Sequence, residues 1–92
     1  MNNKKVRIAV LVSGGGTNLQ ALLDSEARGE LKSGKITLVI SNKAGAYALK
    51  RAEAAGVKTA TVIKDKCGSQ EAFESQLTVL LDENKTDLIV LA

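Results

Sequence analysis

The sequence predicts a three-layer α/β domain, and three observations indicate this class. Four apolar segments alternate with three amphipathic ones along the 92 residues. The first apolar segment runs through three consecutive glycines directly into a helix. The last, residues 87–92, is a continuous apolar run of the kind that parallel sheets bury. Right-handed crossovers between such strands put helices on both faces of one sheet. We therefore predict a Rossmann-like parallel sheet with the strand order 3-2-1-4.

The first half of the chain supplies two strands and two helices. Residues 6–12 form an apolar strand, and a helix follows over residues 17–29. The second strand spans residues 35–40. A second helix begins at Gly45, and Gly56 ends it. Apolar residues share one face of each helix: Leu19, Leu22 and Leu23 in the first, and Ala48, Leu49 and Ala52 in the second.

The second half of the chain adds two more strands around one helix. Residues 58–63 alternate in polarity, which is typical of a half-exposed edge strand, and residues 65–68 read as a polar loop. Ser69 then caps a third helix. Residues 87–92 read as a strand buried on both faces, and its open apolar edge at the end of the sheet predicts self-association. The third helix carries a core-packing stripe: Phe73, Leu77, Leu80 and Leu81.

The turn Gly14-Gly15-Gly16 is the most informative feature for function. Glycine lets backbone N–H groups turn toward a ligand and lets the ligand come close. The helix that follows adds unpaired N–H donors and the positive end of its dipole. A glycine-rich turn can also serve only to connect a strand tightly to a helix. Thr17 and Asn18, both suited to a helix cap, favour binding, so the sequence predicts a phosphate site here.

Two common phosphate-binding patterns are absent or incomplete. No Gly-Lys-Ser/Thr closes the turn, as a P-loop would require. Gly14 and Gly16 fit the first two glycines of the dinucleotide pattern, but Leu19 occupies the third position. Lys43 lies after the second strand, where an acidic residue would bind a ribose hydroxyl. NAD is disfavoured, whereas a phosphorylated sugar or a 2′-phosphate is compatible. The alternatives are an NADP-binding half-Rossmann unit and a stand-alone phosphate- or nucleotide-binding module.

The composition excludes several classes of function. The chain is 45% hydrophobic with a net charge of +3, but no basic patch is interleaved with aromatic residues. We therefore expect no nucleic-acid partner. We expect no membrane association either, because no apolar run is long enough to span a bilayer. The single cysteine, Cys67, cannot form an internal disulfide and carries no assigned role, which fits a cytoplasmic location.

The chain contains no histidine. Imidazole is the side chain most used for proton transfer at neutral pH, so no histidine-based catalytic group can form here. With one cysteine and no histidine, we expect no metal site. Asp24, Asp65 and Glu71 read as solvated charges on helix faces or loops. The sequence therefore predicts no catalytic residue in this chain.

Four segments carry a resemblance to one enzyme family. Residues 10–21 resemble the opening of phosphoribosylglycinamide formyltransferases, in which a strand meets a Ser-Gly-x-Gly-Ser/Thr-Asn-Leu-Gln turn. Residues 41–49 resemble the second βα turn of that family, and residues 54–57 resemble its next connection. Residues 87–92 resemble the strand that leads into the active site of the family. The resemblance covers the whole chain.

The resemblance implies a role in purine synthesis. The family transfers a formyl group from its co-substrate, 10-formyltetrahydrofolate, to the amine of a ribosyl phosphate, 5-phosphoribosylglycinamide. A basic residue near the start of the third helix contacts folate in some members, and Gln70 stands at that position here. The implied phosphate-binding residues are Gly16, Thr17 and Asn18, supported by the turn residues Ser13, Gly14 and Gly15.

The resemblance also implies a division of labour. The catalytic asparagine, histidine and aspartate of the family lie downstream of the position that matches Ala92. Residues 1–92 therefore match the N-terminal phosphate-binding subdomain, without the catalytic C-terminal part. The chain stops inside its most hydrophobic strand, which also suggests the N-terminal portion of a longer protein. We expect the 92-residue chain alone to be inactive.

Overall fold

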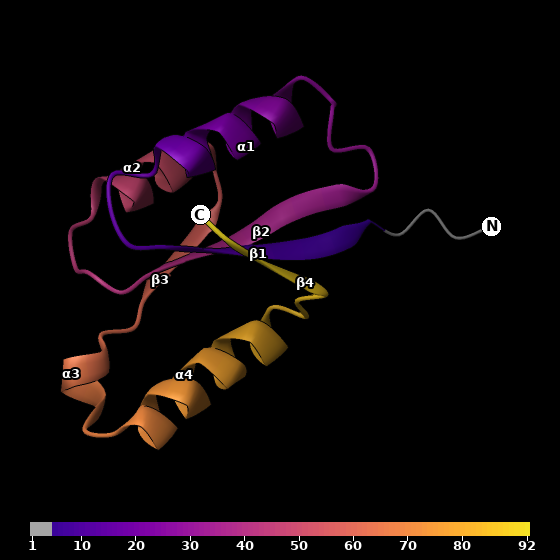
Figure 1. Cartoon of the computed structure of the whole chain (residues 1–92). Helices are drawn as coiled ribbons and strands as arrows, with labels where there is room; N and C mark the ends of the chain where they lie inside the picture. Colours follow the sequence, from indigo (N-terminus) through magenta and orange to yellow (C-terminus); the bar gives the residue numbers. More distant parts are fainter. Residues whose placement is uncertain (1–4) are drawn as a thin grey trace.

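A computed structural model describes residues 5–92 and shows the predicted α/β architecture (Figure 1). The strands all pair in parallel, and their order in the sheet is β3-β2-β1-β4, as predicted. The elements in chain order are β1 (Val6–Val12), α1 (Thr17–Ala27), β2 (Gly34–Ser41), α2 (Tyr47–Ala54), β3 (Lys58–Thr61), α3 (Lys64–Cys67), α4 (Gln70–Glu83) and β4 (Leu88–Leu91).

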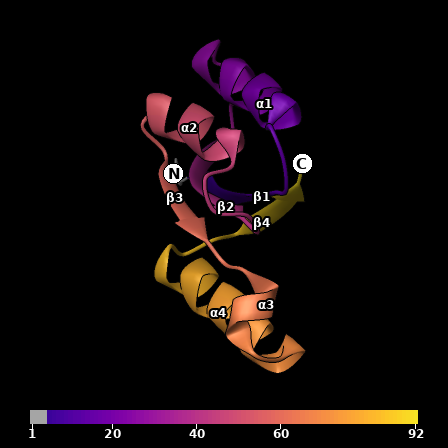
Figure 2. The ribbon, with the colours of Figure 1, turned by 90° about the vertical axis from the view of Figure 1, so that its left-hand side faces the viewer.

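The helices cover the two faces of the sheet in pairs. Figure 2 shows α1 and α2 on one face, with α3 and α4 on the other. Successive side chains of a strand point to opposite faces, so the central strands feed a core on each side. The buried core on the α1–α2 face consists of Ile8, Val10, Val12, Leu19, Leu23, Ile36, Val39, Ala48 and Ala52. The buried core on the α4 face consists of Ala9, Leu38, Ile40 and Val62, against which the predicted α4 stripe of Phe73, Leu77, Leu80 and Leu81 packs.

An irregularity in β2 ties α1 to the sheet. The register shifts between Ile8 and Ala9, where Ile8 pairs with Ile36 but Ala9 pairs with Leu38. Such a shift leaves a backbone group without its ladder partner. Here the N–H of Ile36 donates to Glu26 Oε2 of α1 at 2.7 Å. Because α1 begins at the glycine-rich turn, this bond helps hold the far end of the helix that carries the turn.

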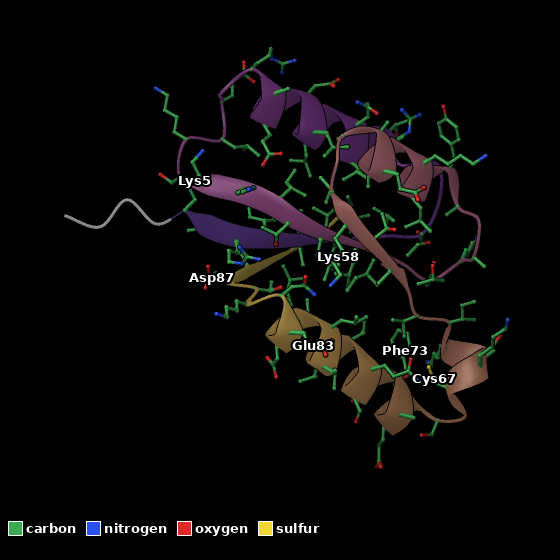
Figure 3. The ribbon with its side chains drawn as sticks, turned by 180° about the vertical axis from the view of Figure 1, so that it is seen from behind. Lys5, Lys58, Cys67, Phe73, Glu83 and Asp87 are labelled. Carbon is green, nitrogen blue, oxygen red and sulfur yellow. The ribbon has the colours of Figure 1, made fainter. Side chains whose placement is uncertain are left out.

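The connection between β3 and α4 differs from its prediction. Residues 65–68 were expected to form a polar loop, but Lys64–Cys67 form the short helix α3. Asp65 lies in its first turn, and Gly68 ends it with a left-handed φ of 89°. An acidic residue at the start and a glycine at the end favour a helical turn, and these signals outweigh the polarity of the segment. Cys67 and Phe73 lie where α3 meets α4 (Figure 3).

The cap of α4 matches its prediction. Ser69 is the N-cap residue, and its Oγ accepts a hydrogen bond from the N–H of Ala72 at 3.1 Å. This side chain therefore satisfies one of the backbone donors that a helix N-terminus leaves without an intrahelical partner.

The prediction that the last strand is buried on both faces is wrong. In the described part of the chain β4 pairs with β1 alone and forms an edge of the sheet. Leu88 and Ile89 are about half exposed, at 49% and 47%, and Leu91 is 80% exposed. Two hydrogen bonds join its start to β1, because the Arg7 N–H donates to Asp87 Oδ2 and the Asp87 N–H donates to the Arg7 carbonyl (Asp87 is labelled in Figure 3).

We propose that two copies of the chain associate through the β4 edge. An edge strand offers unpaired backbone groups, and exposed apolar side chains accompany them here. Ile89→Lys should lower the apparent mass seen by analytical ultracentrifugation across a concentration series. Val79→Lys, which alters an apolar residue of α4 with 54% exposure, is the matched control. A monomeric unsubstituted chain at every concentration, or an equal effect of the two substitutions, would contradict the proposal.

Candidate phosphate-binding site

The glycine-rich turn lies at the carboxyl end of β1, where that strand passes into α1 (Figure 1). Since β1 stands between β2 and β4, the turn opens where the strand order reverses, which is the usual ligand-binding position of such sheets. Gly14 and Gly15 are exposed. A Cβ atom placed on either would have no other atom within 4 Å. A ligand can therefore approach the backbone of both residues closely.

Gly16 occupies a position that only glycine fits. Its φ is 83°, in the left-handed region, and it is the N-cap residue of α1. A Cβ atom there would lie 2.6 Å from Cβ and 2.8 Å from Cα of Ala48, which is fully buried in α2. The backbone of the turn therefore packs directly against Ala48 of α2, and this contact fixes the direction in which the chain enters α1.

The N-terminus of α1 is capped differently from the prediction. Thr17 and Asn18 were expected to supply a side-chain cap, but the N-cap is Gly16 and no side chain accepts a cap hydrogen bond. Both side chains are exposed instead. Among the contacts of residues 5–92, none is a hydrogen-bond partner for the backbone N–H groups from Gly14 to Asn18. A row of donors at the positive end of the helix dipole is thus left for a ligand.

Arg51 lies on the α2 side of the turn, and sequence reasoning did not identify it. Its Nε donates to the Gly15 carbonyl at 2.8 Å, and its Nη1 donates to Gln20 Oε1 at 3.2 Å. Its guanidinium lies over the Tyr47 ring, with Cζ 4.8 Å from the ring centroid. The one available signal was the spacing of four between Tyr47 and Arg51, which puts them on one helix face.

A cavity of about 280 Å³ adjoins the turn at the same edge of the sheet. It is mostly apolar, and Ser13, the residue directly before the glycines, forms part of its wall with Asn42. Phe73, labelled in Figure 3, reaches it from α4. The lining residues are Leu11, Val12, Ser13, Ile40, Asn42, Val62, Phe73, Leu77, Leu91 and Ala92. A polar turn beside an apolar hollow suits a ligand with a charged end and a flatter, less polar part.

Two other sequence-predicted positions make their described hydrogen bonds to residues outside the turn. Gln70 is the first residue of α4, on the other face of the sheet, and its Nε2 donates to Glu74 Oε1 at 3.2 Å. Lys43 is exposed after β2, and its N–H donates to Oγ of the fully buried Ser41 at 3.0 Å.

The packing of Leu19 bears on the dinucleotide alternatives. This residue stands where dinucleotide-binding turns carry a third glycine that lets helix and strand pack closely. Here it is a fully buried part of the core under α1. The helix is therefore held off the sheet by a leucine side chain, which is not the close packing of that pattern.

In residues 5–92 no three His, Cys, Asp or Glu side chains gather to hold a metal ion, and no helix has the length and apolar character needed to cross a bilayer. The ion pair Arg28–Glu30, at 3.0 Å, lies at the opposite end of α1 from the turn. The hydrogen bond and the charge of Arg28 lower the pKa of Glu30, and the same contacts with Glu30 raise the pKa of Arg28.

The chain matches a known enzyme family along nearly its whole length. The family model described as formyl transferase matches residues 6–92. The chain is 41% identical over 87 residues to a phosphoribosylglycinamide formyltransferase of Escherichia coli, covering 95% of the chain and 41% of that protein. It is 43% identical over 89 residues to the human trifunctional purine biosynthetic protein adenosine-3, covering 97% of the chain but 9% of that protein.

Solved structures give the same result. A glycinamide ribonucleotide transformylase from Symbiobacterium toebii superposes with a TM-score of 0.89 at 42% identity, over 96% of this chain and 41% of that one. One from Geobacillus kaustophilus has a TM-score of 0.90 at 33% identity, over 95% and 46%. The chain thus spans about two fifths of the length of these bacterial proteins. With its glycine-rich turn, parallel sheet and these matches, the chain belongs to the formyl transferase family.

Proposed function

We propose that the chain forms the substrate-phosphate-binding part of a phosphoribosylglycinamide formyltransferase. Such an enzyme moves a formyl group from 10-formyltetrahydrofolate to the amine of 5-phosphoribosylglycinamide. The observation that carries the proposal is the set of backbone N–H groups from Gly14 to Asn18, at the start of α1, which have no hydrogen-bond partner within residues 5–92. Gly16, Thr17 and Asn18 would donate to the phosphate oxygens, and Ser13, Gly14 and Gly15 would shape the turn.

The charge and shape around the turn support this assignment. A phosphate dianion is stabilised by backbone donors at a helix N-terminus and by the dipole behind them. Arg51 adds a positive charge beside Gly15, at 2.8 Å from its carbonyl oxygen. The space around Gly14 and Gly15 leaves room for the oxygens. No carboxylate accepts a hydrogen bond from a turn residue within residues 5–92, so the described contacts set no negative charge against the ligand.

The cavity next to the turn suits the co-substrate. Its lining is mostly aliphatic, with Phe73 from α4 and two polar groups, Ser13 and Asn42. A flat heterocycle that needs apolar contact and a few hydrogen bonds fits such a surface better than a second phosphate does. We therefore propose that this cavity supplies part of the surface for 10-formyltetrahydrofolate. The single cysteine and absence of an internal disulfide fit the cytoplasm, where we place the protein.

Titration with inorganic phosphate and with ribose 5-phosphate, followed by amide NMR, tests the site. The amide signals of Gly16, Thr17 and Asn18 should move progressively to saturation, because their N–H groups receive the anion. The start of α4 is an internal control, since Ser69 Oγ already accepts from Ala72 there. Shifts spread over Lys5, Arg7 and other basic residues without a maximum at the turn would contradict the proposal.

Asn18→Ala tests the contribution of one side chain to the same site. We expect binding of ribose 5-phosphate to weaken by about 1–2 kcal/mol, the usual effect of losing a hydrogen bond to a charged group. Because the Asn18 side chain is exposed and makes no cap bond, the melting temperature should stay unchanged. Gln76→Ala, which removes an exposed amide from α4, is the matched control. Equal affinities of the two variants would rule out a contact from the Asn18 side chain.

A further inference from the structure

We propose that Arg51 is a positioning residue for the phosphate site. Its guanidinium holds the Gly15 carbonyl on the α2 side of the turn, so that the N–H of Gly16 points to the opposite side, toward the anion. The inference rests on the proposed function, because it names the group that orients the donors of that same site.

The geometry of the peptide bond supplies the first step. The Gly15 carbonyl and the Gly16 N–H belong to one planar trans peptide unit, in which the two groups point in opposite directions. Fixing the carbonyl therefore fixes the N–H. Arg51 Nε donates to this carbonyl at 2.8 Å, which is a short, charge-assisted hydrogen bond. The donor of Gly16 is thus directed by a residue that lies 36 positions away in the sequence.

The turn needs such a contact because glycine itself fixes little. Gly14 and Gly15 have no side chains, and their backbones are open to solvent on the side where a Cβ would lie. Glycine populates a wider range of backbone angles than any other residue, so a free glycine turn would lose entropy on binding. Among the hydrogen bonds within residues 5–92, the bond from Arg51 is the one made by a backbone group of Gly14 or Gly15.

Arg51 can orient the turn because two further contacts, with Gln20 and with Tyr47, set its own position. Its Nη1 donates to Gln20 Oε1 at 3.2 Å, and Gln20 Nε2 in turn donates to Asp24 Oδ1 at 2.9 Å. Its guanidinium stacks over Tyr47, one helical turn earlier in α2. A guanidinium is planar and offers several donors in fixed directions, so it can bind the Gly15 carbonyl and Gln20 together while stacking. An ammonium group carries the same charge but not this geometry.

Three substitutions separate orientation from charge. Arg51→Ala removes both, Arg51→Lys keeps the charge and the aliphatic stem, and Lys50→Ala removes the same charge from an exposed neighbour on the same helix. The probe is inorganic phosphate, titrated into the full chain and followed by amide NMR. The Gly15 carbonyl ¹³C shift of the unliganded protein is the second readout, since it reports the hydrogen bond from Arg51 directly.

We expect Arg51→Ala and Arg51→Lys each to weaken phosphate binding roughly fivefold to tenfold, as the loss of an orienting charge-assisted hydrogen bond implies. Lys50→Ala should stay within about twofold, because an exposed charge is screened by solvent and salt. The Gly15 carbonyl signal should move in both Arg51 variants and not in Lys50→Ala. Amide signals of the buried strand residues Leu38 and Val39 should keep their positions, showing that the fold is intact.

Each other outcome overturns the inference in an identifiable way. If Arg51→Ala binds phosphate as tightly as Lys50→Ala does, Arg51 does not position the turn, while the proposed function stands. If Arg51→Lys binds like the unsubstituted chain, the charge acts and the orientation does not. If Arg51→Ala fails to fold, Arg51→Lys still decides between these two results. If the unsubstituted chain shows no shifts at Gly16 to Asn18, the proposed function fails and the inference fails with it.

Discussion

Gly16→Ala is expected to destabilise the domain by about 2–4 kcal/mol, the sum of a left-handed backbone cost and a steric overlap. The φ of 83° disfavours any L side chain, and the added Cβ would lie 2.6 Å from Cβ of Ala48. Ala48 is fully buried and sits on α2, so it cannot move without disturbing the core. The turn would open away from α2, and the N–H groups that face the ligand would lose their arrangement.

Urea unfolding measures the first effect, and a phosphate titration by NMR measures the second. Gly14→Ala is the matched control, because a Cβ there meets no atom within 4 Å and Gly14 has no positive φ. We expect this control to change the free energy of unfolding by less than about 0.5 kcal/mol, as for an exposed site without special geometry. A Gly16→Ala variant as stable as Gly14→Ala would show that α2 does not pack against the turn as described.

Most of the fold could be predicted because local and global signals agree. The glycines at positions 16, 29, 45, 56 and 68 all have positive φ. Gly16 caps the start of α1, Gly29 follows its C-cap, and Gly56 follows the C-cap of α2, so these three mark ends of helices that the periodicity also predicts. Apolar runs at 6–12 and 35–40 become the two central strands. The strand order follows from right-handed crossovers, since a short half-exposed strand such as Lys58–Thr61 belongs at the edge.

The incorrect predictions concern features that depend on neighbours. The apolarity of Leu88–Leu91 shows that the strand suits a buried position but not what covers it, and in residues 5–92 the outer side of β4 has no paired strand. Polarity suggested a loop at 65–68, although a four-residue helix can expose all its polar groups. In both cases composition was interpreted without the packing that decides the outcome.

In the candidate site, too, local patterns could be predicted from the sequence and contacts between distant residues could not. Gly14, Gly15 and Gly16 identify the turn because glycine spacing is a local pattern. The prediction that Thr17 and Asn18 cap α1 was wrong because Gly16 occupies the N-cap position in a left-handed conformation, which leaves both side chains exposed. Arg51 could not be predicted, since its bond to Gly15 exists only after α2 packs against the turn. No periodicity links two residues that far apart.

The 92-residue chain is expected to show no formyl transfer above background. Attack of the substrate amine on the formyl carbon forms a tetrahedral oxyanion and releases a proton from nitrogen. Stabilising the oxyanion requires donors aimed at that oxygen, and removing the proton requires a base near the amine. The turn supplies donors for the phosphate, and binding or orientation alone lowers only part of the barrier. The chain has no histidine to serve as the base.

The three carboxylates that the sequence singled out are not placed to fill this gap. Asp24 is exposed on α1, and its Oδ1 accepts from Gln20. Asp65 lies on α3 and Glu71 on α4, both exposed and both on the opposite face of the sheet from the helix that follows the turn. None of the three contacts a turn residue through a hydrogen bond. None of the three is therefore placed at the turn by a described contact, and we expect none of them to take the proton of the amine.

The assay supplies 10-formyltetrahydrofolate and 5-phosphoribosylglycinamide and follows the loss of the formyl donor by absorbance. The Escherichia coli phosphoribosylglycinamide formyltransferase, 41% identical to the chain over 87 residues, is the positive control. The same preparation must show the amide shifts at Gly16 to Asn18 with ribose 5-phosphate. This control shows that the chain is folded and binds its ligand, so that a lack of turnover cannot be due to unfolding. Turnover by the chain alone at an enzyme-like rate would mean that residues 1–92 hold a catalytic group, and that phosphate binding is only part of what they do.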